Sequence, residues 1–165
     1  MNIHPLFVHF PIGLLVIYCL LELIRFKKFL INDYFRFLKG FLSITGLLTA
    51  GTAVITGYLA KRTLYPTGEA SRLIETHETF AQMTFLIFSI LAGAYFIYFI
   101  GISKYSKLIP KFIYSIANFI RESWLTPLIA LLGLILITIT GGLGAAIVYG
   151  ADVDPFVKAI YSLFF

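Results

Sequence analysis

Charged residues are scarce in this chain. Only 13% of its 165 residues are Asp, Glu, Lys or Arg and 59% are hydrophobic, whereas soluble domains carry about 25% charged residues. The composition therefore indicates a membrane protein, and the length suits a single domain over residues 1–165. Cys19 is the only cysteine, which excludes an internal disulfide and a C-x-x-C-H attachment site for c-type haem.

Motifs of several enzyme classes are absent as well. The chain has no nucleotide-binding loop, no G-x-S-x-G nucleophile turn and no H-E-x-x-H zinc motif. The centres of its apolar runs carry no charge that would mark an ion pathway. These absences argue against an ATPase, a serine hydrolase and an ion-coupled transporter. The N-terminus lacks a basic start followed by a small-residue cleavage site, so we expect no cleavable signal.

Four apolar runs are long enough to cross a membrane, which takes about 20 residues. Their length and lack of alternation indicate helices, because only helices or closed barrels satisfy the backbone in hydrocarbon. We therefore predict an all-α fold, a four-transmembrane-helix bundle with interfacial amphipathic segments. Near the end of the first run, Glu22 has Arg25 three residues further on as its expected partner. The predicted spans are residues 6–24, 41–60, 79–102 and 124–149.

Basic residues are distributed unevenly among the loops. Nine of the thirteen Lys and Arg residues lie in the first and third loops, and four lie elsewhere. By the positive-inside rule, these two loops face the cytoplasm. We therefore predict an integral protein of the cytoplasmic membrane with both termini and the second loop outside. The same distribution explains the net charge of +5 without nucleic-acid binding.

The segments flanking the spans have patterns of their own. Over residues 108–120, apolar positions three or four apart face lysines on the opposite side, which predicts an interfacial helix or an extension of the fourth span. Residues 26–40 are similar. After the fourth span, Asp154 followed by Pro155 is a helix start signal. It predicts a short terminal helix on the outer surface.

The two halves of the chain resemble each other. Each half begins with a histidine near the outer end of a span and returns on a helix rich in Thr and Gly. The segment 54–57, Val-Ile-Thr-Gly, resembles the segment 138–141, Thr-Ile-Thr-Gly. This similarity predicts halves related by an axis along the membrane normal, with His9 and His77 as equivalent residues.

All three histidines of the chain, His4, His9 and His77, are predicted to lie near the outer surface. A titratable, metal-binding side chain at membrane depth is costly and marks a candidate functional site. On a helix, His4 and His9 are separated by about 7.5 Å of rise and about 140° of rotation. Both rings therefore cannot face one ion, and one must face the bundle while the other faces its rim.

His9 and His77 are the predicted pair, because Gly13 lies one turn from the first and Ala81 one turn from the second. Two axial ligands from opposing helices of a bundle hold haem b without a covalent motif. We therefore predict haem b with His9 and His77 as iron ligands. Arg72 is the predicted partner of a propionate. His4 would support the site or bind another group.

Two other interpretations stay open. Glu75 and Glu78 flank His77, and Asp152 and Asp154 add carboxylates, so the histidines would also suit a zinc or copper site. Alternatively, the protein is a cofactor-free structural or assembly subunit, in which each histidine is an ordinary interfacial polar residue. In that case the small residues of the second span, such as those of 46–57, pack against partner helices.

Three sequence features resemble a family of small four-helix predicted bacterial membrane proteins of unknown function. They are the opening His4-Pro5-x-x-Val8-His9-Phe10-Pro11-Ile12, the Arg72-x4-His77 spacing and Gly141-Gly142 followed by Val148-Tyr149-x-x-Asp152-Val153. Many relatives carry a further histidine after the final Val-Tyr, where this chain has Gly150-Ala151. Through its association with cytochrome c-type domains, the family implies a link to respiratory electron transfer.

These features together predict a membrane cytochrome b-like electron-transfer subunit rather than a standalone enzyme. Haem b would lie near the outer leaflet between the first and third spans. The expected partners are membrane lipid, other subunits of a respiratory or cytochrome complex, and membrane quinol as the electron donor.

Overall fold

The computed structural model of the protein describes residues 4–24, 32–63 and 67–165. In these ranges the chain forms helices and no strand. Four helices are long and apolar enough to cross a membrane, which confirms the predicted all-α, four-span bundle. They are α1 (His4–Leu23), α3 (Asp33–Thr63), α4 (Glu69–Gly101) and α6 (Leu125–Tyr149).

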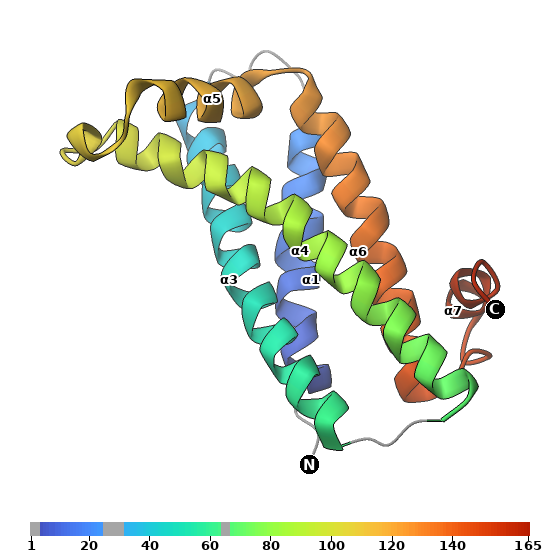
Figure 1. The fold of residues 1–165 in the computed structure, drawn as a ribbon. Coiled ribbons are helices and arrows are strands. Elements are labelled where there is room, and N and C mark those ends of the chain that lie inside the picture. The colour runs from blue at the N-terminus through green and yellow to red at the C-terminus, as the bar shows by residue number, and fades with distance from the viewer. Residues whose placement is uncertain (1–3, 25–31, 64–66) are drawn as a thin grey trace.

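The four long helices form a bundle in which α1 and α4 occupy opposite corners (Figure 1). Both of these helices pack along α3 and along α6. Their side chains meet across the bundle, where the buried ring of Tyr18 on α1 contacts Phe88 and Tyr95 on α4 edge-on, with centroids 6.4 and 6.1 Å apart. Groups on α1 and α4 can therefore meet only through the bundle interior.

Two short helices lie near the two ends of the bundle. The helix α5 (Lys111–Glu122), preceded by the 3-10 turn η1 (Ser106–Leu108), lies across one end, and α7 (Pro155–Tyr161) lies at the other (Figure 1). We call the end with α7, where α1 and α4 begin, the histidine end, because it holds His4 and His77. The opposite end, which contains Glu22, is the Glu22 end.

Helix boundaries differ from the predicted spans where polar residues continue a helix beyond the apolar run. The predicted span 41–60 begins at Asp33 in α3, and the span 79–102 begins at Glu69 in α4. Hydropathy marks where the chain is in lipid, whereas a helix continues for as long as its residues tolerate helical geometry. In the predicted amphipathic segment 26–40, residues 33–40 belong to α3 and residues 26–31 lie outside the described part.

Both predicted surface helices are confirmed. The third-loop segment forms the separate helix α5, whose apolar residues Phe112, Ile116 and Phe119 are exposed along one side. In α7, Asp154 is the N-cap: its Oδ1 accepts a hydrogen bond from the Val157 amide at 2.8 Å. This bond satisfies one of the amides that a helix start leaves without a partner.

The closest approach of α1 to α3 depends on Gly46. A Cβ atom built on this glycine would lie 2.4 Å from Leu15 Cδ2 and 2.7 Å from Leu15 Cγ. Leu15 is fully buried, so its side chain has no space to move into. Small residues at such positions allow the helices to pack closely.

We expect Gly46→Val to destabilise the bundle by about 1–3 kcal/mol, the usual cost of overpacking a filled core. The free energy of unfolding in detergent micelles, followed by circular dichroism, measures this loss. Gly13→Ala is the matched control, since an added Cβ there meets no atom within 4 Å. Equal stability of the two variants would contradict the close packing of α1 on α3.

Candidate functional site: a histidine pair at one end of the bundle

The three histidines take two different positions. His4 and His77 are half-buried, whereas His9 is exposed. The 140° rotation between His4 and His9 has the expected consequence that only one of them faces the bundle. The structure assigns this inward position to His4.

His4 begins α1 and its ring lies against α3. Its Nδ1 is 3.0 Å from Thr56 Oγ1, and the Thr56 hydroxyl donates its own proton to the carbonyl of Ala53 at 3.0 Å. A hydroxyl that donates to a carbonyl keeps its oxygen available to accept from Nδ1–H of the histidine, and the ring also hydrogen-bonds the backbone of Ala53. In the tautomer with Nδ1–H, the lone pair of the imidazole is on Nε2. A Cβ at Gly57 would lie 3.0 Å from His4 Cε1, so this glycine makes room for the ring.

His77 is held in the same manner by α6. Its Nδ1 lies 3.0 Å from the carbonyl oxygen of Thr140. A carbonyl only accepts, so Nδ1 of His77 carries the proton and Nε2 the lone pair. A Cβ at Gly144 would lie 3.1 Å from His77 Cε1. Each inward imidazole thus donates from Nδ1 to a threonine and lies against a glycine of the neighbouring helix.

The two inward rings belong to helices at opposite corners of the bundle and lie at the same end of it, His4 against α3 and His77 against α6. Metal-ligating histidines characteristically donate their second ring N–H to a carbonyl, a carboxylate or a similar oxygen, which fixes the tautomer and the direction of the ring. His4 and His77 both meet this condition. The pair therefore has the donor chemistry of two imidazole ligands offered from two helices.

His9 occupies a different environment. Its Nδ1 donates to the carbonyl of Pro5 at 2.6 Å within the same helix, and its ring is exposed. His4, rather than His9, contacts a neighbouring helix in the way that His77 does. The assignment of His9 as an axial ligand stays a prediction, and the geometry favours His4 in that role.

Arg72, the predicted propionate partner, and the nearby Lys61 both have protein partners. The guanidinium of Arg72 lies 5.7 Å from the ring centroid of Phe165, beyond α7. Lys61 of α3 forms an ion pair with Glu78 of α4. Arg72 is exposed at the histidine end and contacts an aromatic ring, and its role as a propionate partner stays a prediction.

The carboxylates considered for a zinc or copper site also have other contacts. Glu75 accepts a hydrogen bond from Ser71 at 3.1 Å, and Asp154 caps α7. Asp152 pairs with Lys158 at 2.8 Å and raises the pKa of that ammonium group. Among the residues that the structure describes, no group of three or more His, Cys, Asp and Glu side chains is placed to hold a metal ion.

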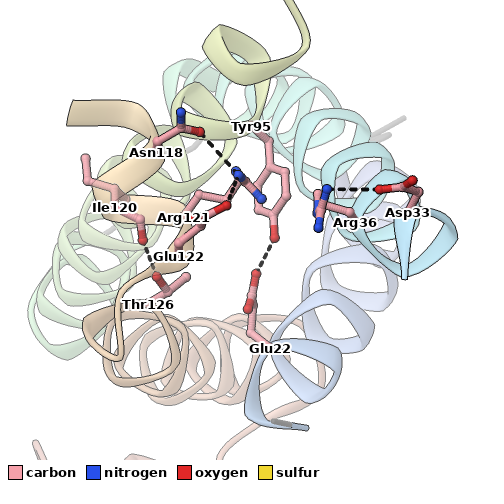
Figure 2. Close-up of polar contacts among 9 residues, drawn as sticks. All are labelled: Glu22, Asp33, Arg36, Tyr95, Asn118, Ile120, Arg121, Glu122 and Thr126. Atoms are coloured by element: carbon pink, nitrogen blue, oxygen red, sulfur yellow. Dashed lines mark hydrogen bonds and ion pairs between the residues drawn. The ribbon is translucent and has the colours of Figure 1, made fainter. Parts of the chain in front are cut away.

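A buried polar network at the Glu22 end did not follow from the sequence. Glu22 is 1% exposed. Its carboxylate accepts hydrogen bonds from Tyr95 Oη at 2.6 Å and from Lys39 Nζ at 3.0 Å. Figure 2 shows Glu22 of α1 and Tyr95 of α4 pointing toward each other across the end of the bundle. The expected partner Arg25 lies outside the described residues.

Arg121 of α5 lies beside this network (Figure 2). Its guanidinium donates to Asn118 Oδ1 at 3.2 Å, pairs with Glu122 and lies 4.0 Å from the ring centroid of Tyr98. The contact with Tyr98 fastens α5 to α4, whereas Asn118 and Glu122 belong to α5 itself. The signal that could have revealed the Glu22–Lys39 pair is the presence of opposite charges at the same depth on consecutive antiparallel spans.

Comparisons of the chain with protein-family models, with curated proteins and with solved structures found no match. Functional inference for this protein therefore depends on the geometry of its own residues.

Proposed function

We propose that the protein is a membrane cytochrome b-like electron-transfer subunit that binds haem b at the histidine end, between α1 and α4. The observation that carries the proposal is the pair His4 and His77. Two imidazoles with Nε2 as the donor atom, presented from opposite corners of a four-helix bundle, match the ligand set of a bis-histidine haem. When bound, the haem would supply one-electron redox chemistry.

The surrounding residues have distinct roles in this proposal. Thr56 and the Thr140 carbonyl orient the two rings through Nδ1, while Gly57 and Gly144 leave space for them. Hydrogen bonds of this kind also raise the basicity of the ligand. Arg72 lies at the rim, and its guanidinium is the kind of group that binds a propionate carboxylate.

The predicted orientation places the histidine end outside the cytoplasmic membrane. Electrons would then pass between membrane quinol and an acceptor on the outer side, within a complex that contains other subunits. The motif resemblance and the charge distribution of the loops support this assignment.

An absorption spectrum of the purified protein before and after dithionite tests the proposal. We expect a Soret band and, after reduction, a sharp α band, with haem identified as the b type by acid extraction. A protein that is colourless and takes up no added haem would contradict the proposal. Metal analysis of the same sample distinguishes a zinc or copper protein from a cofactor-free scaffold.

A further inference from the structure

An apolar groove lies between α4 and α5 at the Glu22 end. Its volume is about 280 Å³. The α4 wall consists of the small residues Ser89, Gly93 and Ala94 together with Ile90 and Ile97. The α5 wall consists of Ile113, Ile116, Ala117 and Ile120.

The groove results from the way in which the two helices separate. Near the start of α5 they touch, since a Cβ at Gly101 would lie 2.1 Å from Tyr114 Cε2. Further along, a Cβ at Gly93 would meet no atom within 4 Å. The two helices therefore diverge beyond the contact between Gly101 and Tyr114 and leave a groove between them. The small side chains of α4 do not fill this groove.

The surroundings of the groove favour an alkyl chain as its occupant. The α4 segment that forms the wall belongs to a charge-free run from Thr79 to Gly101, so hydrocarbon surrounds it in a membrane. The one hydroxyl in the lining, that of Ser89, donates to the carbonyl of Phe85 at 2.7 Å. An apolar cavity without polar partners does not hold water.

The charges beside the groove favour an anionic head group. No Asp or Glu occurs between Glu78 and Glu122. In this interval the exposed Lys104, Lys107 and Lys111 lie where α4 passes through η1 into α5, adjacent to the Ile113 end of the groove. Clusters of basic residues close to the membrane surface attract anionic lipids.

We propose that the groove between α4 and α5 binds one acyl chain of an anionic phospholipid whose phosphate is held by Lys104, Lys107 and Lys111. The lipid would fill the space between the helices and fix the angle at which α5 leaves α4. This site is independent of the histidine pair at the opposite end of the bundle.

Fluorescence quenching by brominated lipids tests the proposal. In a Trp124→Phe background, which removes the single natural tryptophan, Ile116→Trp places a reporter in the groove. The vesicles are phosphatidylcholine containing increasing fractions of phosphatidylglycerol or phosphatidylcholine brominated on the acyl chain. We expect brominated phosphatidylglycerol to reach half-maximal quenching at a fraction about fivefold lower than brominated phosphatidylcholine does. This factor corresponds to the attraction of roughly one basic residue to an anionic surface.

Two controls make the result specific. Leu20→Trp, exposed on α1 two residues before Glu22, reports general contact with lipid at a comparable depth and should show no preference. Replacing Lys104, Lys107 and Lys111 with Gln should abolish the preference at Ile116→Trp. If Ile116→Trp does not fold, Gly93→Trp serves as the reporter, because its Cβ enters open space.

Equal quenching by the two lipids in the groove would overturn the proposal. An equal preference for phosphatidylglycerol at Leu20→Trp would also overturn it, because it would indicate attraction to the whole protein surface. The proposal would fail as well if the preference at Ile116→Trp persisted after the three lysines were replaced.

Discussion

Alanine at either His77 or His4 is expected to abolish haem binding, whereas alanine at His9 is expected to leave it intact. The two inward imidazoles supply the iron ligands in the proposed site, and loss of either removes half of the ligand set. His9 is exposed and donates to its own helix, so its removal should not change the site. The measurement is the haem content and the reduced α band of each purified variant.

Thr56→Val refines this prediction. Valine keeps the size of the side chain but removes the oxygen that accepts from His4 Nδ1. Loss of such a supporting contact typically lowers affinity by about 10–100-fold. Thr140 offers no equivalent variant, since His77 uses its backbone carbonyl.

The pattern of results identifies which pairing is correct. Loss of haem in His9→Ala with retention in His4→Ala would support the pair expected from the sequence and contradict the pair inferred from the structure. Retention of haem in all three histidine variants would exclude both.

Lys39→Met is expected to destabilise the protein by about 3–5 kcal/mol, the usual cost of removing one partner of a buried ion pair. Glu22 would stay 1% exposed, and the Tyr95 hydroxyl would still donate to it. A buried carboxylate without a compensating charge is costly in a medium of low dielectric constant. Denaturation of the micellar protein, followed by circular dichroism, measures the loss.

Two further variants separate the ion pair from general effects of charge. The double variant Glu22→Leu with Lys39→Met should recover most of the lost stability, since apolar replacement of a whole buried pair is often neutral. Lys158→Gln removes a pair with Asp152 in which the two side chains are 69% and 81% exposed, and it should leave the free energy of unfolding nearly unchanged. If Lys39→Met behaves like Lys158→Gln, the Glu22 network does not stabilise the fold.

The bundle itself could be predicted from the sequence because lipid imposes a simple requirement. A charge-free run of sufficient length has to form a helix in hydrocarbon, and no tertiary contact is needed to reach that conclusion. The N-cap of α7 was predictable for a similar reason, since Asp154 and Pro155 act on the backbone immediately after them. Local chemistry and the solvent determine both features.

The choice between His4 and His9 needed the structure. Helix geometry shows that only one can face the interior, but the rotation of α1 about its axis depends on packing against α3 and α6. Leu15 over Gly46 is part of that packing, and no local pattern in α1 encodes it.

The similarity between residues 54–57 and 138–141 identified the helix positions that contact the inward histidines. Thr56 and Thr140, which correspond in the two segments, are the residues that hold His4 and His77. The internal similarity was thus a correct guide to the helix positions that receive the rings. By these contacts, His4 corresponds to His77, whereas the equivalence of His9 with His77 stays a prediction.

Each inward imidazole is fastened to the returning helix of its own hairpin, His4 to α3 and His77 to α6. Insertion of the first hairpin would therefore orient one ligand while the second hairpin is still being synthesised. The complete pair exists only after both hairpins associate in the bilayer. Capture of a prosthetic group between them would then favour correctly assembled molecules over half-assembled ones during biogenesis.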